Sequence, residues 1–295
     1  MTRRLGALLV ACAVAAAACG GSQPQQKLIG VTLLTQSHSF FKELEFGLQE
    51  EANARGYTLV IRACEFDAPK QASQIEDFVA QKVLAIVAAP CDSSALVPAL
   101  AGPERAGIPV FTTDIAAHGG KVVSHIASDN VQGGALAAEE MAARLNGKGK
   151  IIIIDHPTVS SVQDRVRGFE EAMKKFPGIT IVAKPSANGA REQAQRVMED
   201  MLQAHRDLAG VFGINDDSAL AAAGVIERAG RKDVVVIGFD ATDEAQAAIR
   251  KGGPLKADVV QYPRKIGQTT MEMVARHLAG EQVPKLVPIQ VGIWK

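Results

Sequence analysis

Short apolar runs recur along most of this chain, and each is followed by a longer segment with an apolar stripe on one side. The runs do not alternate polar and apolar residues, which is typical of parallel strands that helices cover on both faces. The predicted strands are residues 27–34, 57–62, 84–88, 109–113, 150–154, 179–183, 211–214, 234–239, 256–260 and 286–291. The predicted helices are residues 40–55, 67–81, 93–106, 162–175, 191–204, 218–229, 243–251 and 263–278. This alternation predicts an α/β fold built on doubly wound parallel sheets.

The stretch Val122–Asn130 lies near the middle of this pattern and separates two similar halves. It begins as a short, mostly apolar strand, and Asp129 then offers a side-chain oxygen that can cap a helix from about Val131 onward. We interpret the stretch as the crossing from one α/β layer to a second, which predicts two lobes with a cleft between them. The tail from about residue 256 holds one more strand–helix unit than the second lobe needs, so we expect it to return to the first lobe.

Composition excludes several classes of partner. A chain of 295 residues with 47% hydrophobic content is long enough for about two domains, each with its own core. Its 32 basic and 32 acidic side chains balance, and no basic block interrupts the sequence. Nothing therefore attracts a phosphate backbone, and we expect no nucleic-acid partner.

The first residues have the features of an export signal. Arg3 and Arg4 precede an uninterrupted apolar run, Leu5–Ala18, which is too short to span a bilayer comfortably. The end of the run resembles a bacterial lipobox, in which Cys19 is lipidated after cleavage; ordinary cleavage after the run is the alternative. We therefore expect residues 1–19 to be a signal peptide of the lipoprotein type and residues 20–26 to be a flexible tether to a membrane anchor.

The expected chemical state of the four cysteines follows from this interpretation. Cys12 leaves with the signal and Cys19 carries lipid, so Cys64 and Cys91 remain in an oxidising compartment. Each follows a predicted strand, and parallel strands that end at one rim bring such loops together. A disulfide between them and two separate buried thiols are both compatible with the sequence.

The residues that follow the apolar runs are the candidates for a binding site, because ligands of open α/β sheets bind beyond the carboxyl ends of the strands. Most are neutral hydrogen-bonding groups, with a few carboxylates, one arginine and an aromatic pair. This inventory suits a neutral polyhydroxylated molecule, since carboxylates and amides accept from hydroxyls and aromatic faces cover the C–H side of a ring. The candidates are His38, Phe40, Phe41, Asp92, Asp114, Ser128, Asp129, Arg165, Asn188, Asn215, Asp216, Phe239, Asp240 and Gln261.

Several of these segments resemble the periplasmic ribose-binding protein family, which serves sugar ABC transporters. The resemblance runs from about residue 27 to the end of the chain, and its segments are residues 39–41, 122–130, 215–216 and 236–240. The long segment 122–130 is the most specific of them. The resemblance implies two doubly wound lobes, joined by a three-segment hinge, that close on a sugar. It also implies an N-terminal lobe of residues 27–127 plus 262–289 and a C-terminal lobe of residues 128–261 plus 290–295.

The resemblance also implies roles for individual residues. Phe40 and Phe41 match ring-stacking aromatics, and Asp114 matches a carboxylate that accepts from sugar hydroxyls. The implied ligands of the second lobe are Arg165, Asn215, Phe239 and Asp240, and those at the hinge are Ser128 and Gln261. Purely structural roles are the alternatives: packing in the hydrophobic core for the two phenylalanines, turn or cap positions for the aspartates, and a surface ion pair with Asp164 for Arg165.

Four positions depart from the family pattern. His38 stands where ribose binders have Asn, and Asn188 stands where they have an aromatic residue; both remain candidate ligands here. Ala89 replaces an Asn and Ile115 replaces an Arg. The last two changes remove donors to ring hydroxyls, each charge-assisted hydrogen bond being worth roughly 1.5–3 kcal/mol, which makes ribose itself a doubtful ligand.

We therefore expect an exported solute-binding protein of an ABC importer that captures a neutral monosaccharide or polyol by hinge closure. The expected partners are the small ligand and an inner-membrane permease. We expect a monomer with no cofactor or metal. The main alternative is a receptor of the same fold for a nucleoside or a signalling furanose. A lactose-repressor-type regulator would carry a helix-turn-helix headpiece where this sequence holds a signal and a tether. A glycoside-cleaving enzyme would have to use Asp114 and Asp240 as its carboxylate pair.

Overall fold

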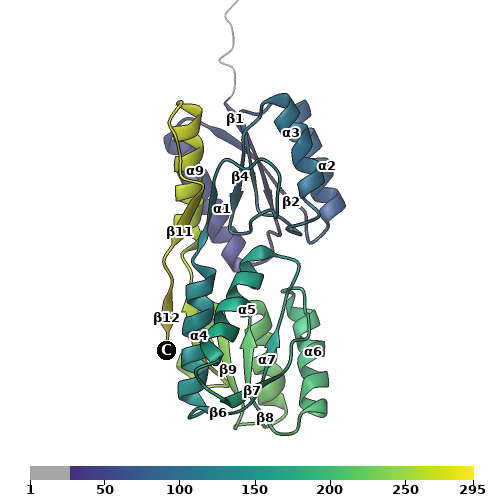
Figure 1. Cartoon of the computed structure of the whole chain (residues 1–295), viewed down its shortest axis with the longest axis vertical. Helices are drawn as coiled ribbons and strands as arrows, with labels where there is room; N and C mark the ends of the chain where they lie inside the picture. Colours follow the sequence, from purple (N-terminus) through teal and green to yellow (C-terminus); the bar gives the residue numbers. More distant parts are fainter. Residues whose placement is uncertain (1–26) are drawn as a thin grey trace, which may run out of the picture.

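The computed structural model describes residues 27–295, and these form two α/β lobes stacked end to end (Figure 1). Each lobe is built on a six-stranded sheet with helices packed against it, as the alternation of apolar runs predicts. The predicted signal peptide, the lipidation at Cys19 and the tether lie outside the described residues.

The first sheet is parallel throughout and has the strand order β11-β5-β4-β3-β1-β2. Its strands are β1 (Leu28–Leu33), β2 (Thr58–Ala63), β3 (Ala85–Ala88), β4 (Val110–Thr113), β5 (His125–Ser128) and β11 (Leu286–Ile289). The central strands β3 and β4 are buried along their whole length, which explains why their sequences do not alternate.

The second sheet repeats this arrangement with the order β12-β10-β9-β8-β6-β7. Its strands are β6 (Lys148–Ile154), β7 (Gly178–Ala183), β8 (Leu208–Gly213), β9 (Val235–Asp240), β10 (Leu255–Val260) and β12 (Gly292–Trp294). All neighbours are parallel except β12, which lies antiparallel to β10 at the sheet edge. The sequence pattern does not predict β12, because three half-buried residues are too few to form a distinct apolar run.

The helices connect the strands and cover both sheets. They are α1 (Ser39–Ala54), α2 (Ala68–Ala80), α3 (Ala101–Ala106), α4 (Asn130–Arg144), α5 (Ser160–Met173), α6 (Arg191–Ala204), α7 (Asp216–Arg228), α8 (Asp243–Lys251) and α9 (Pro263–Leu278). Asp129 caps α4 as predicted and accepts from the Gln132 backbone N–H at 3.0 Å, and Asp67 caps α2 by accepting from that of Lys70 at 2.9 Å. The helix predicted over residues 93–106 is shorter, since turns and a 3₁₀ helix (Val97–Leu100) replace its first half.

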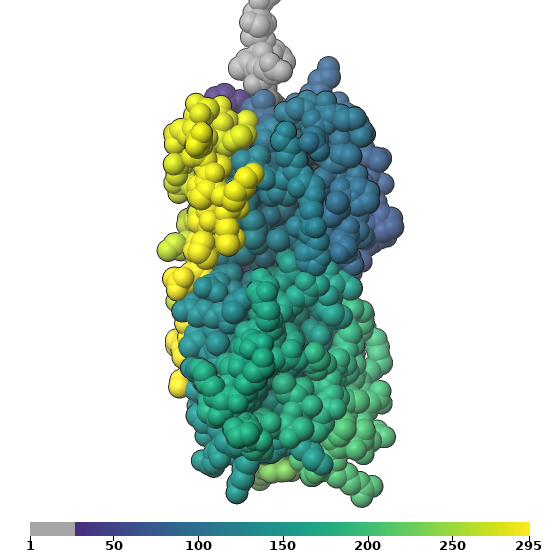
Figure 2. Space-filling view, in the orientation of Figure 1, coloured from purple at the N-terminus to yellow at the C-terminus, as the bar shows by residue number. Residues whose placement is uncertain are grey.

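Three segments of chain connect the lobes. One joins β5 to α4, one joins β10 to α9 and one joins β11 to β12. Figures 1 and 2 show the C-terminal part, in yellow, running along one edge of both lobes. The tail therefore divides: β10 stays in the second sheet, whereas α9 packs against α1 in the first lobe and β11 extends the first sheet. The prediction that the tail returns is correct for α9 and β11 and wrong for β10.

A disulfide joins Cys64 and Cys91, whose Cα atoms are 6.6 Å apart. Cys64 directly follows β2 and Cys91 follows β3, and both strands flank β1 in the sheet. The bridge thus ties two loops together at the rim of the first sheet that faces the second lobe. No helix of the described residues is long and apolar enough to cross a membrane.

Candidate functional site

A small cavity of about 50 Å³ lies between the lobes, where strands of both sheets end at their carboxyl termini. This is the position at which α/β proteins bind ligands. A cavity of this size has room for a few water molecules. It is lined by Leu34, His38, Phe40, Phe41, Phe66, Asp114, Ile115, His156, Val159, Ser161, Val162, Arg165, Gly189, Ile214, Asn215, Asp240 and Gln261.

The start of α1 supplies the aromatic wall of the first lobe. Phe40 and Phe41 are 6% and 4% exposed, and their rings meet edge to face with centroids 5.2 Å apart. Both rings line the cavity. His38 immediately precedes the helix, and its Nε2 lies 3.3 Å from a carboxylate oxygen of Asp217 in the second lobe. His38 therefore contacts the opposite lobe directly as well as lining the cavity.

Asp114 presents a carboxyl group to the cavity from the end of β4. Its backbone has a φ of 61°, a left-handed conformation that turns the chain sharply after the strand. Burial raises the pKa of Asp114 to about 7, and the nearby charge of Arg165 only partly opposes this. A buried carboxyl with no described donor beside it is well suited to accept hydrogen bonds from ligand hydroxyls.

Arg165 faces Asp114 from α5, and its guanidinium is held on three sides. Its Nε and Nη2 donate to the Asn130 side-chain oxygen at 3.2 and 2.8 Å, and its Nη1 donates to the backbone oxygen of Ile214. The guanidinium also lies 3.5 Å from the centroid of the Phe239 ring. These contacts use three of the five N–H groups, which leaves two for a ligand. The alternative pairing with Asp164 does not occur, since Asp164 pairs with Arg167.

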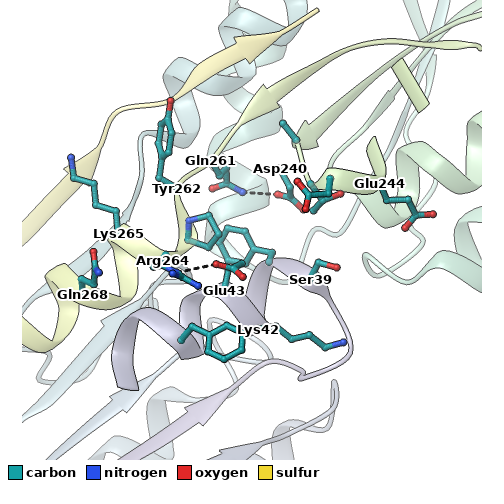
Figure 3. A pocket seen from close by; sticks show the side chains of 16 residues that line it. Ser39, Lys42, Glu43, Asp240, Glu244, Gln261, Tyr262, Arg264, Lys265 and Gln268 are labelled. Atoms are coloured by element: carbon teal, nitrogen blue, oxygen red, sulfur yellow. Dashed lines mark hydrogen bonds and ion pairs between the residues drawn. The ribbon is translucent and has the colours of Figure 1, made fainter. Parts of the chain in front are cut away.

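Asp240 and Gln261 form the end of the cavity next to the hinge. Gln261 donates from Nε2 to a carboxyl oxygen of Asp240 at 2.6 Å, as Figure 3 shows. The other side-chain atom, Gln261 Oε1, is buried without a partner among the described residues. The pKa of Asp240 is raised by burial and by the charge of Asp216, against the attraction of Arg165. The cavity is therefore richer in acceptors than in donors.

Asn215 borders the cavity and also caps a helix. Its side-chain oxygen accepts from the Ser218 backbone N–H at 2.9 Å, which satisfies the start of α7, and its amide donates to the Gly189 backbone oxygen at 3.0 Å. The capping role predicted for Asp216 belongs to Asn215. The Asp216 carboxylate accepts from Thr242 instead.

Two aromatic residues of the cavity were not predicted. Phe66 follows β2, and its ring centroid lies 5.7 Å from that of His38 and 6.4 Å from that of His156 in the opposite lobe. Burial lowers the pKa of His156 to about 4, so its ring is neutral near pH 7. Phe66 comes three residues after the end of β2 and His156 two residues after the end of β6, so a strand-end rule that extends over three residues would have included them.

Six of the fourteen candidates do not line the cavity: the strand-end residues Asp92, Asp129 and Asp216, and three of the ligands named with the family resemblance, Ser128, Asn188 and Phe239. Phe239 lies under the Arg165 guanidinium and supports it from behind. Ser128 is buried in the first hinge segment, and Asn188 lies in a loop where it bonds to Ser186 and Gln193. The other predicted ligands are His38, Phe40, Phe41, Asp114, Arg165, Asn215, Asp240 and Gln261, and the fold brings them together. Of the family departures, Ile115 lines the cavity, whereas Ala89 is buried away from it.

A larger and open groove of about 890 Å³ lies beside the cavity, between α1, α8 and the start of α9 (Figure 3). It shares Phe40, Asp240 and Gln261 with the cavity. Its other walls include several exposed charged side chains, such as Glu43, which pairs with Arg264 at 3.1 Å. Exposed pairs of this kind mark a solvated surface, so we assign the site to the smaller cavity, where buried polar groups converge.

No group of side chains in residues 27–295 is arranged to hold a metal ion.

The fold and the cavity define a two-lobed binding protein whose candidate site lies between the lobes. The chain belongs to the periplasmic binding protein family: the family model of that domain matches residues 29–282. The chain is 37% identical over 260 residues to the ribose import binding protein of Bacillus subtilis, covering 88% of this chain and 84% of that protein. It is 32% identical over 260 residues to a xylitol-binding protein of Mycolicibacterium smegmatis, covering 85% and 74%. A solute-binding protein of Mycobacterium smegmatis with bound glycerol superposes with a TM-score of 0.86 at 34% identity, covering 91% and 94%.

Proposed function

We propose that this protein is the solute receptor of an ABC importer and binds a neutral monosaccharide or polyol between its lobes. The observation that carries the proposal is the acceptor-rich cavity between the lobes, formed by Asp114, Asp240 and Gln261 with Arg165 as its cation. Hydroxyl groups of a ligand would donate to these acceptors and accept from the two remaining N–H groups of the guanidinium. The phenylalanine pair at the start of α1 would cover the C–H face.

We infer that ligand binding and lobe closure are one equilibrium. The cavity has walls from both lobes, so a ligand contacts both only when they are closed. Such a ligand selects the closed state. Its apparent association constant equals the association constant of the closed form multiplied by the fraction of protein that is closed without ligand. The closed form would then be the one that the permease recognises.

The finer identity of the ligand is a separate proposal. Ile115 contributes an apolar side chain where ribose binders have Arg, and Phe66 with His156 adds an aromatic border. These residues favour a ligand with fewer hydroxyls than a hexose, such as a pentose or a short polyol. They also support the alternative of a furanose that carries a planar or apolar substituent, including a nucleoside.

We further infer an envelope location, which membership in the family supports. Cleavage of residues 1–19 with lipidation of Cys19 would anchor the receptor to a membrane, and the sequence of the first residues supports it. We expect a monomeric receptor without catalytic activity, because the relatives named above are binding proteins.

A thermal-shift and calorimetry panel tests the function. The panel contains ribose, xylitol, glycerol, myo-inositol, glucose and adenosine, with ribose 5-phosphate as the control. Ligand at one hundred times its dissociation constant stabilises the folded protein by about 2.7 kcal/mol, which is readily measured. We expect a shift with at least one neutral compound and none with the phosphate, because two buried carboxyls disfavour an anion. A response to the phosphate alone, or to no compound, contradicts the proposal.

A further inference from the structure

The turn that carries Asp240 has an unusual backbone. Asp240 has a φ of 128° and Ala241 a φ of 54°, two consecutive residues in conformations that side chains other than glycine rarely adopt. Such conformations persist only where the surroundings hold them in place, and they are concentrated at functional sites. The direction of the Asp240 carboxyl therefore depends on what holds this turn.

Two buried carboxyl groups hold the turn from behind. Asp258 on β10 accepts a hydrogen bond from the Ala241 backbone N–H at 3.1 Å. Asp216 at the start of α7 accepts from the Thr242 backbone N–H at 2.7 Å and from the Thr242 hydroxyl at 2.5 Å. Neither carboxyl lines the ligand cavity, and Asp258 is fully buried. Both act on the residues next to Asp240 rather than on a ligand.

Each of the two carboxyl groups also has one buried oxygen without a hydrogen-bond partner among the described residues. These atoms are Oδ1 of Asp216 and Oδ2 of Asp258, and one proton shared between the two carboxyl groups would satisfy both. Carboxylate oxygens are only acceptors, so a hydrogen bond between two of them needs a proton on one. The charges of Asp240, Asp114 and Arg165 act on the same region, and burial raises the pKa of both Asp216 and Asp258.

The neighbouring strand leaves room for this pair. Gly238 on β9 lies opposite Asp258 in the sheet, and a Cβ at that position would lie 2.3 Å from Oδ2 of Asp258. A side chain there would displace the carboxyl group. The glycine of the segment Gly238–Asp240 is thus required by the carboxyl pair behind the site.

We propose that Asp216 and Asp258 share one proton and act together as positioning residues, which hold the turn at Ala241 so that Asp240 points into the ligand cavity. The inference rests on the proposed function only for the role of Asp240 as a ligand. All the groups involved belong to the second lobe, so the arrangement does not depend on lobe closure.

Two variants at one position separate this role from simple packing. In Asp258→Asn the side-chain oxygen still accepts from Ala241 N–H, and the amide donates to Asp216 in place of the shared proton. In Asp258→Ala both contacts are lost. The matched control is Glu140→Ala, which removes a largely buried carboxylate of the same lobe that bonds to Arg144 and Lys295 and not to the turn.

Amide exchange and carbon NMR provide readouts that need no ligand. In the wild type and in Asp258→Asn, we expect the Ala241 and Thr242 amides to be protected, and in Asp258→Ala their protection should fall by about 100-fold. Glu140→Ala should leave it unchanged. The ¹³C shifts of the side-chain carboxyl groups report their protonation. In the wild type at about pH 7, we expect them to show one proton on the Asp216–Asp258 pair.

Binding of ribose and xylitol is measured by calorimetry on the same proteins. We expect Asp258→Asn to remain within about threefold of the wild-type dissociation constant, and Asp258→Ala to lose about 30-fold or more. Two ionised carboxyls at pH 7, or wild-type protection and affinity in Asp258→Ala, would overturn the inference. If the wild type binds neither sugar, the proposed function fails, while exchange and carbon shifts still decide the arrangement of the turn.

Discussion

Direct hydrogen bonds between the lobes should set how readily the protein closes. Three of them meet at the start of α5. The Ser93 backbone N–H donates to the Thr158 oxygen at 3.0 Å, the Ser160 backbone N–H donates to the Ser93 hydroxyl at 2.9 Å, and the Ala116 backbone N–H donates to the Ser160 hydroxyl at 2.7 Å. Ser93 and Ala116 belong to the first lobe and the other two residues to the second. We call these contacts the Ser93–Ser160 clasp.

The double variant Ser93→Ala/Ser160→Ala removes two of the three hydrogen bonds and leaves the one to Thr158. Each bond contributes about 1 kcal/mol, so closing should become less favourable by about 2 kcal/mol. In a receptor that is mostly open without ligand, the apparent dissociation constant rises by the same factor as the closing constant falls, here about 30-fold. Neither hydroxyl is needed to form the cavity, so the intrinsic contacts to a ligand remain.

Stopped-flow fluorescence with the sugar that gives the largest thermal shift measures this effect. Trp294 is the single tryptophan of the chain and lies on β12, just past the third segment between the lobes. We expect faster dissociation, a nearly unchanged association rate and a larger radius of gyration at subsaturating ligand. Ser73→Ala, which removes an exposed hydroxyl on α2, is the control. A double variant whose affinity lies within about twofold of the wild type would refute the reasoning, because the clasp would then contribute less than about 0.4 kcal/mol.

Three further outcomes follow from the site and the disulfide. Because the pKa of Asp114 in the folded protein is raised to about 7, its protonated form stabilises the fold fully below about pH 4, and this contribution is lost as the pH rises through 7. The free energy of unfolding should therefore fall over this range by at most about 4 kcal/mol. In urea titrations at several pH values, Asp114→Asn should lack this fall. An Asp114→Asn protein with the wild-type pH dependence would contradict this. Replacing Cys64 and Cys91 by Ser should lower the free energy of unfolding by about 3.5 kcal/mol on the chain-entropy model for a separation of 27 residues. If a reductant leaves the urea midpoint of the wild type unchanged, that result argues against the bridge. Asp240→Asn should weaken sugar binding by about 30-fold in calorimetry while the melting temperature stays the same or rises, since burial and Asp216 raise the pKa of Asp240 and an amide carries no charge at any pH. A large loss of stability would instead make Asp240 a structural residue.

Much of the fold could be predicted because its signals are local. Strands such as β3 and β4 are uniformly apolar, and helix starts are marked by capping residues such as Asp67 and Asp129. The predictions fail where the signal is short or where geometry at a distance decides. Strand β12 has only three residues, and the separation of β10 from α9 depends on which sheet edge is vacant.

The candidate site was predictable as a set of strand ends and less so as a set of contacts. The strand-end rule finds Asp114 and Asp240, because the topology of a parallel sheet forces those ends to one side. It cannot tell that Phe239 supports Arg165 instead of facing the cavity, nor that Asn188 remains outside. Those outcomes depend on side-chain direction and on how far the lobes close.

The sequence by itself determined the two-lobed α/β architecture. This architecture follows from the periodicity of apolar residues, which acts over a few residues at a time. Only the tertiary structure decided the pairing of Cys64 with Cys91, the stacking of Arg165 on Phe239 and the carboxyl pair behind Asp240. Each of these joins residues from separate strands or helices, and such proximity arises only when the sheets have assembled and water has been excluded between them.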